Sequence, residues 1–173
     1  MSSNKRRQGF SLIELVVVVS ILAVLAGALI PRVAERMARA RDARRLADVQ
    51  SIKAAIESYY LDRGEFPTPR TNASFGGWDV SHDGSFVSDL RDQGYLSEDA
   101  VDPVNDDTYH YRFYVYKQGA YGCNGETDYF VLGIRNFETA EFSKEHKGFF
   151  KCSGRNWANE FAYVTGGGAT WKE

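Results

Sequence analysis

An unbroken apolar run near the N-terminus sets the strongest constraint on how this chain folds. Residues 10–30 read FSLIELVVVVSILAVLAGALI, which is 21 residues with a single charge at Glu14. As a helix rising about 1.5 Å per residue, the run is about 31 Å long and matches the hydrocarbon core of a bilayer. The run is therefore predicted to be a transmembrane helix, and the 173-residue chain has room for one ordinary domain behind it.

Charge is distributed unevenly along the chain. Residues 1–9 are basic without any acid, residues 32–45 carry six arginines against Glu35 and Asp42, and the part from Leu46 onward has a net charge of −8. Because contact with phosphates needs a basic surface, a domain this acidic is a poor candidate for nucleic-acid binding. A nucleic-acid or lipid-headgroup patch is one interpretation of these arginines. They are distributed around the helix with acids between them, which better suits a solvated or inter-subunit face, with Glu35 and Arg39 as a favourable i, i+4 pair.

The helical pattern continues beyond the apolar run. Small and apolar residues recur at steps of three and four from Val33 to Tyr59, and Gly64 is the expected stop. Residues 31–63 are thus predicted to be the amphipathic half of the same long helix. Pro31 and Gly27 lie inside the pattern, so a kink or local melting is expected at residues 27–31. Two helices with a break at Pro31 are the alternative.

Residues 64–173 are predicted to form a globular head, giving a chain of the α+β class. The head begins with a long loop of little regular structure, followed by a short helix N-capped by Ser85 with Phe86, Val87 and Leu90 pointing inward. Alternating residues predict antiparallel strands at 108–117, 127–135 and 159–165, with a short fourth strand at 148–152. The amphipathic half of the long helix is expected to pack on one face of this small sheet.

The head offers two cysteines and no convincing catalytic constellation. Cys123 and Cys152 form a disulfide if the head lies outside the cytoplasm, and two buried free thiols are the alternative. Ser81, His82 and Asp83 are adjacent in a loop, whereas a catalytic triad is assembled across a fold around a nucleophile on a strained turn. The sequence therefore does not predict an enzyme.

Three interpretations compete for residues 1–30. A conventional secretory signal would be cut near Ala26, Gly27 and Ala28, but such signals have an apolar region of only about 7 to 15 residues. A plain membrane anchor explains the length but gives no reason for a carboxylate at Glu14, which costs free energy in hydrocarbon. The third interpretation takes the basic leader, Gly9, Phe10 and Glu14 together.

These residues resemble a known family. The stretch KRRQG-FSLIELVVVVSILAVLAGALIP is similar to the leader and N-terminal segment of type IV pilins and of the pseudopilins of type II secretion systems. The resemblance joins five features in order: a basic leader, Gly9, Phe10, Glu14 and, at the far end, Pro31. It implies the type IV pilin-like fold, in which the hydrophobic half of the long helix protrudes and the other half packs on an antiparallel sheet.

The resemblance also implies processing and a role for Glu14. In this family a prepilin peptidase cuts after the final glycine of the leader, here between Gly9 and Phe10, and methylates the new amino terminus, here Phe10. Residues 1–9 are then the leader peptide and residues 10–30 the transmembrane and assembly helix. A lone carboxylate in hydrocarbon demands a partner. The family implies that Glu14 pairs with the N-terminal amine of a neighbouring subunit.

The function implied is that of a structural subunit of a type IV pilus or of a type II secretion pseudopilus. Its expected partners are other pilin subunits, the prepilin peptidase, an inner-membrane assembly platform and, before assembly, the membrane itself. The head is expected outside the cytoplasm, first anchored at the inner membrane and then in a pilus or a periplasmic pseudopilus. No cofactor is expected. The alternative is a secreted or membrane-anchored extracytoplasmic binding domain that uses a conventional signal.

The branch of the family is left open by the sequence. LDRGEFPT and GYLSEDAVDPVNDDTYHYRF are similar to the major pseudopilins, but AYVTGGGATWKE lacks the acidic ligands of their calcium loop. Four residues in one short loop offer oxygen ligands without fitting a calcium motif, and an acidic turn before a strand is the simpler interpretation: Asp102, Asn105, Asp106 and Asp107. Cys123 and Cys152 are more similar to the C-terminal disulfide of pilus subunits.

Overall fold

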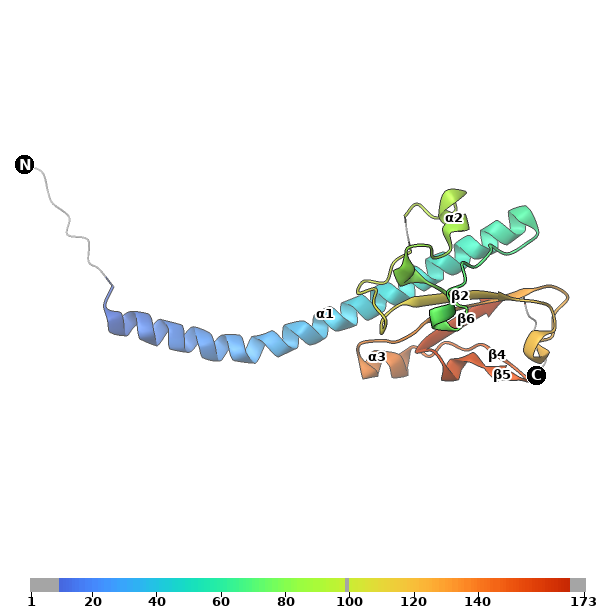
Figure 1. Ribbon diagram of the computed structural model, residues 1–173. Helices are drawn as coiled ribbons and strands as arrows, with labels where there is room; N and C mark the ends of the chain where they lie inside the picture. The colour runs from blue at the N-terminus through green and yellow to red at the C-terminus, as the bar shows by residue number, and fades with distance from the viewer. Residues whose placement is uncertain (1–9, 99, 169–173) are drawn as a thin grey trace, which may run out of the picture. The chain divides into compact units, whose positions relative to one another are not determined.

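The computed structural model describes residues 10–98 and 100–168. The chain divides into two compact units, one ending at Met37 and the other beginning at Ala38. Helix α1 (Leu12–Arg63) belongs to both units, and every other helix and strand belongs to the second (Figure 1).

Helix α1 is a single α-helix along its full length. Its hydrogen-bonded pattern continues through residues 27–31, so the expected melting is not observed and the alternative of two helices broken at Pro31 is wrong. A proline removes one backbone donor from a helix, and the remaining bonds carry the helix past that position. Gly64 ends α1 as predicted, with φ of 75° and an N–H that donates to the carbonyl of Tyr60 at 2.8 Å.

An antiparallel sheet of four strands forms the centre of the second unit. Its order is β1 (Asp79–Val80), β2 (Tyr111–Tyr116), β3 (Tyr129–Ile134) and β6 (Tyr163–Gly167). Strands β2, β3 and β6 lie within or beside the predicted strands. The strand expected at 148–152 is reduced to β4 (Lys151–Cys152), which pairs with β5 (Arg155–Asn156) in a separate hairpin.

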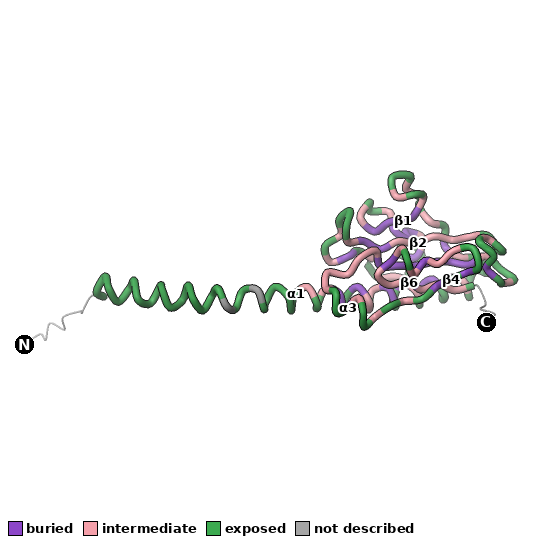
Figure 2. The backbone as a smooth tube through the Cα atoms, turned by 90° about the horizontal axis from the view of Figure 1, so that it is seen from below, coloured by how far each residue is buried: buried purple, intermediate pink, exposed green. Residues whose placement is uncertain are grey.

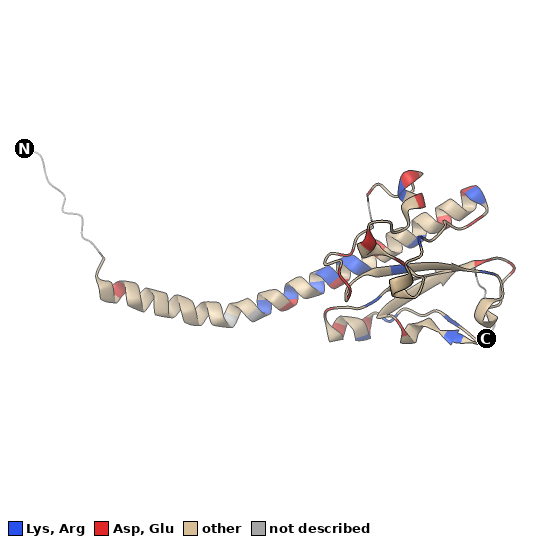
Figure 3. Cartoon of the chain, viewed as in Figure 1, with Lys and Arg blue, Asp and Glu red and all other residues tan. Residues whose placement is uncertain are grey.

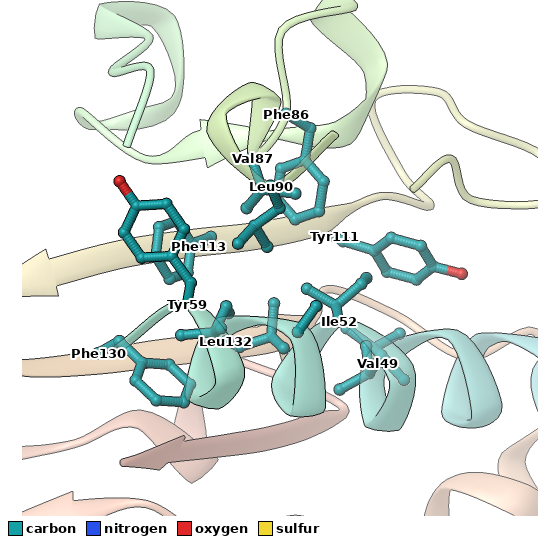
Figure 4. Packing of buried hydrophobic residues seen from close by; sticks show 13 residues of the cluster. Val49, Ile52, Tyr59, Phe86, Val87, Leu90, Tyr111, Phe113, Phe130 and Leu132 are labelled. Carbon is teal, nitrogen blue, oxygen red and sulfur yellow. The ribbon is translucent and has the colours of Figure 1, made fainter. Parts of the chain in front are cut away.

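The C-terminal half of α1 covers one face of this sheet, as the sequence predicts (Figure 4). Val49, Ile52, Ile56 and Tyr59 are buried against side chains of β2, β3 and the segment 86–90. Burying one large apolar side chain stabilises the fold by about 1.5 to 3 kcal/mol. The buried partners are Phe86, Val87, Leu90, Tyr111, Phe113, Phe130, Leu132 and Ile134.

The opposite face of the sheet carries a second core that the sequence did not predict. Trp78, Trp157, Phe150 and Phe161 pack there against Val131 of β3. Figure 1 shows the β4–β5 hairpin on the side of the sheet opposite α1. Every residue of β3 is therefore buried, and the continuous apolar run YFVLGI is the sequence signal of a strand covered on both faces.

A disulfide between Cys123 and Cys152 ties strand β4 to the loop before β3. It confirms the predicted pairing over the alternative of free thiols. The two cysteines are 29 residues apart, a loop whose closure contributes about 3 to 4 kcal/mol in the chain-entropy model. The covalent bond thus fastens the hairpin that closes the second core.

The segment between α1 and β2 departs from the prediction in two ways. It is more regular than expected, because Asp79–Val80 pairs with Phe113 and Arg112, and short 3-10 turns occupy Ala73–Phe75 and Ser81–Asp83. The predicted N-cap at Ser85 is wrong, since α2 (Ser88–Asp92) begins three residues later. Val87 adopts a left-handed conformation with φ of 41°, which keeps residues before it out of the helix.

Asp79 holds this segment together from inside the fold. It is fully buried, and its Oδ2 accepts the backbone N–H groups of Arg70 at 3.0 Å and Val87 at 3.1 Å, while Oδ1 has no partner among the described residues. Burial raises the pKa of Asp79 to about 7, and the two N–H donors offset only part of this effect. The nearby charges are Asp83, which raises the pKa further, and Arg70, which lowers it.

We expect this carboxyl to give the fold a pH dependence. Between about pH 4 and pH 7 the native state keeps a proton on Asp79 that the unfolded state has lost, so the free energy of unfolding falls as pH rises and levels off above pH 7. The contribution is about 2 to 4 kcal/mol. Asn in place of Asp79 still accepts both N–H groups but cannot ionise. Urea unfolding at pH 4.5 and 7.5 should show that Asp79→Asn removes this decline; an identical pH profile in both proteins would contradict the prediction.

Candidate functional site

The apolar half of α1 is exposed throughout in the described chain. From Leu12 to Ile30 its large hydrophobic side chains are each at least half exposed, and Figure 2 shows this stretch as exposed wherever its burial is described. The helix is long and apolar enough to cross a membrane. Soluble proteins rarely expose a continuous apolar surface of this size, so the segment requires a bilayer or other subunits around it.

Glu14 lies in the first turn of this helix. Its Oε2 accepts the backbone N–H of Ser11 at 2.9 Å, and Leu15 donates to the carbonyl of Ser11 at 3.2 Å. A glutamate that reaches back from the third helical position to the N-cap residue forms one half of a capping box. The carboxylate thus satisfies one of the donors that the helix start leaves open. Phe10 precedes this turn and is 90% exposed, whereas Gly9 lies outside the described residues.

Comparison with known proteins places this N-terminus in context. Residues 4–30 match the prokaryotic N-terminal methylation motif. The type II secretion system core protein G of Pseudomonas aeruginosa is 30% identical over 143 residues, covering 72% of this chain and 92% of that protein. The chain belongs to the type IV pilin and pseudopilin family. The core protein G of Vibrio cholerae is 26% identical over 82% of this chain and 90% of its own length.

Pilins of the family match over a shorter region. A fimbrial protein of Neisseria meningitidis serogroup A is 36% identical over 70 residues, so the chain spans only 41% of that pilin's length. No solved structure matches the chain. The long helix on an antiparallel sheet agrees with the pilin fold, and the relatives are pilus and secretion-system proteins, which confirms the prediction that the chain is not an enzyme.

A buried ion cluster within the second unit of this pilin-family chain fixes two loops to the C-terminal half of α1. Arg45 is fully buried, and its Nε and Nη2 donate to the two carboxylate oxygens of Asp102 at 2.7 and 3.0 Å. Its Nη1 donates to Asp42 at 2.8 Å and to Glu138 at 2.7 Å. We call Arg45 with these three carboxylates the Arg45 clamp. Its members come from α1 and from two loops far apart in the sequence.

The carboxylates of the clamp also accept hydrogen bonds from the backbone of two loops. Asp42 accepts the N–H groups of Glu138 and Thr139, both at 2.9 Å, and the hydroxyl of Thr139 at 2.8 Å. Asp102 accepts the N–H groups of Val104 and Asn105 at 2.8 and 3.2 Å. Two loops of the pilin fold are thereby docked on one turn of α1. This cluster was not predicted from the sequence, although the i, i+3 spacing of Asp42 and Arg45 is a signal for it.

Hydrogen bonds within the clamp favour the charged forms of Arg45 and Glu138. Burial lowers the pKa of Arg45, but the hydrogen bonds to Asp102 and Glu138 outweigh burial and raise it above its usual range. The hydrogen bond from Arg41 lowers the pKa of Glu138 to about 2, with Arg45 acting in the same direction. Arg41 and Arg45 thus both stabilise the Glu138 carboxylate.

Two further arginines of residues 32–45 have carboxylate partners of their own. Arg39 pairs with Glu145 at 2.9 Å, so the predicted pair of Glu35 and Arg39 is wrong: a head carboxylate supplies the partner instead. Arg44 lies 3.7 Å from Asp48. Figure 3 shows the basic stretch of α1 directly after its apolar half.

The four calcium candidates of the pilin-family chain serve separate purposes. Asp102 belongs to the Arg45 clamp, and the side chain of Asn105 accepts the hydroxyl of Ser81 at 2.8 Å. Asp106 accepts the N–H groups of Thr108 and Tyr109, and Asp107 lies 3.3 Å from His82. Within the described residues, no group of three or more His, Cys, Asp or Glu side chains is arranged to hold a metal. These contacts fit the interpretation as an acidic turn before a strand.

Replacing Arg45 should destabilise the fold strongly. Arg45→Met leaves Asp42 and Asp102 buried without their counter-charge, which costs about 3 to 5 kcal/mol. Arg44→Met is the matched control, because the Arg44 side chain is 67% exposed, and it should change stability by no more than about 0.5 kcal/mol. Urea unfolding of the two variants measures the difference, and equal stabilities would show that the clamp contributes little.

Proposed function

We propose that the chain is made as a membrane precursor, cut between Gly9 and Phe10, methylated at Phe10 and polymerised through α1 into a filament. The exposed apolar half of α1 is the observation that carries this proposal. Such a surface fits the bilayer before assembly, and its burial among the helices of neighbouring subunits supplies the main driving force for the filament. The match to the N-terminal methylation motif supports the processing step.

Glu14 gives the assembly its register. In the chain with its leader attached, the Glu14 carboxylate caps its own helix through Ser11. Cleavage frees an amine on Phe10, one helical turn before Glu14, and creates a cation that did not exist in the precursor. Pairing of Glu14 with the Phe10 amine of a neighbouring subunit compensates both charges away from water. A subunit whose leader is still attached cannot offer this amine.

The proposed location follows from the same segment. The basic leader stays in the cytoplasm, in agreement with the positive-inside rule, and α1 crosses the inner membrane with the head outside. The disulfide between Cys123 and Cys152 supports a head in an oxidising compartment. The proposed partners are the prepilin peptidase, the assembly platform in the inner membrane and further pilin-family subunits.

Within the family, the match favours a secretion pseudopilus. The core proteins G of Vibrio cholerae and Pseudomonas aeruginosa are covered over at least 90% of their lengths, whereas the match to the fimbrial protein of Neisseria meningitidis is confined to 70 residues. A pilus subunit is the second candidate, supported by the higher identity of that shorter match. A binding domain with a conventional signal is disfavoured, because such a signal does not need the methylation motif.

The first test is the mature N-terminus. Mass spectrometry of the protein purified from membranes should find a chain that begins with N-methylated Phe10. The same protein from cells without a prepilin peptidase should retain residues 1–9. A mature chain beginning at Leu29 would instead indicate a conventional signal and overturn the proposal.

The second test separates the two properties of Glu14. Glu14→Gln keeps an oxygen that accepts the Ser11 N–H but loses the charge, whereas Glu14→Ala loses both. If charge pairing directs assembly, both variants should be processed normally and both should reduce filament yield by at least about tenfold, as expected for a lost contact of about 1.4 kcal/mol. Electron microscopy of sheared filaments measures this. Normal filaments with Glu14→Gln would show that the cap, rather than the charge, is what matters.

A further inference from the structure

The six arginines that follow the apolar run divide into two groups by their partners. The four later ones each lie within ion-pair distance of a carboxylate: Arg39, Arg41, Arg44 and Arg45. Arg32 and Arg36 are exposed and make no ion pair or hydrogen bond with the residues that the structure describes. Within residues 10–98 and 100–168 the chain thus provides counter-charges for the later arginines but none for Arg32 and Arg36.

The division coincides with distance from the apolar segment. Residues 10–30 as a helix match the thickness of the hydrocarbon core, and the polar layer of each leaflet adds about 5 to 8 Å. At about 1.5 Å per residue, Arg32 lies about 3 Å beyond Ile30 and Arg36 about 9 Å, within reach of this layer because long side chains bend back toward it. Arg39, about 14 Å beyond Ile30, is well beyond this layer and is the first of the six with a protein partner.

Arg32 and Arg36 also lie on one face of the helix. Residues four apart are neighbours one turn apart, so the two guanidinium groups can approach the same headgroup or two adjacent ones. Guanidinium binds phosphate oxygens in a bidentate manner. Glu35 is the one acid between Pro31 and Ala38 and leaves this stretch with a net positive charge.

We propose that Arg32 and Arg36 bind the phosphates of anionic phospholipids in the outer leaflet and hold the unassembled subunit at a defined depth. This inference rests on the proposed function only in requiring that residues 10–30 span the membrane. It also gives a reason why arginines lie on the extracytoplasmic side, although the positive-inside rule predicts an excess of basic residues in the cytoplasm. The contact is lost when a subunit leaves the bilayer, so it opposes premature extraction.

The test uses the full-length chain in phosphatidylcholine vesicles that contain a trace of spin-labelled lipid. Electron paramagnetic resonance measures the fraction of labelled phosphatidylglycerol, or of labelled phosphatidylcholine, that the protein restricts. One arginine near an anionic surface favours association by about fivefold, so the wild type should prefer phosphatidylglycerol by about that factor or more, and high salt should reduce the preference. Arg32→Gln with Arg36→Gln should bring the preference close to one.

Arg44→Gln is the matched control. It removes the same charge from the same helix, but about 21 Å beyond Ile30, and should keep the wild-type preference. A double variant that also keeps the preference would overturn the inference. If that variant keeps the preference and loses its filaments, the arginines bind a neighbouring subunit's carboxylates instead.

The lipid assay requires neither cleavage nor assembly, so its outcome is independent of the tests of the proposed function. A chain that prefers phosphatidylglycerol but begins at Met1 in its mature form would overturn the processing proposal and leave this inference standing. A correctly processed, filament-forming chain without lipid preference would overturn this inference and leave the processing proposal standing.

Discussion

Packing of the C-terminal half of α1 against the sheet is the interaction on which the rest of the structure depends. Val49, Ile52 and Ile56 are buried by β2 and β3, and this contact fixes the position of every strand relative to the helix. A helix of 52 residues has far more surface than a sheet of strands five or six residues long can cover. Folding buries the C-terminal half of α1 and leaves its apolar half exposed. The proposed assembly into a filament depends on this exposed half.

The Arg45 clamp shows how an acidic domain tolerates buried charge. Removing an arginine and several carboxylates from water is costly, and the cost is offset only where each group finds charged partners at hydrogen-bond distance. Arg45 meets this condition, since its Nε, Nη1 and Nη2 all donate to carboxylate oxygens at distances between 2.7 and 3.0 Å. Some of the carboxylates counted in the negative charge of the domain are therefore paired with Arg45 inside the protein. The negative charge on the outer surface is smaller than the count from the sequence suggests.

Local patterns predicted the long helix, its end at Gly64 and the three main strands, because apolar spacing and glycine reflect constraints within one element. The N-terminal motif was recognisable for the same reason, as Gly9, Phe10 and Glu14 lie within six residues. The second core, the Arg45 clamp and the late start of α2 could not be predicted in this way. Trp78 and Trp157, Arg45 and Glu138, and Asp79 and Val87 become partners only after the chain has folded.

The strand order carries a consequence for how the head is made. β6 (Tyr163–Gly167) completes the sheet beside β3, so the last of the described strands to be synthesised is one of the two neighbours of β3. α1 can form as soon as it emerges, because its backbone hydrogen bonds are local, whereas sheet closure waits for contacts more than 25 residues apart. α1 is therefore formed long before the domain that it carries, and the incomplete sheet must be kept from pairing with other chains until β6 has been synthesised.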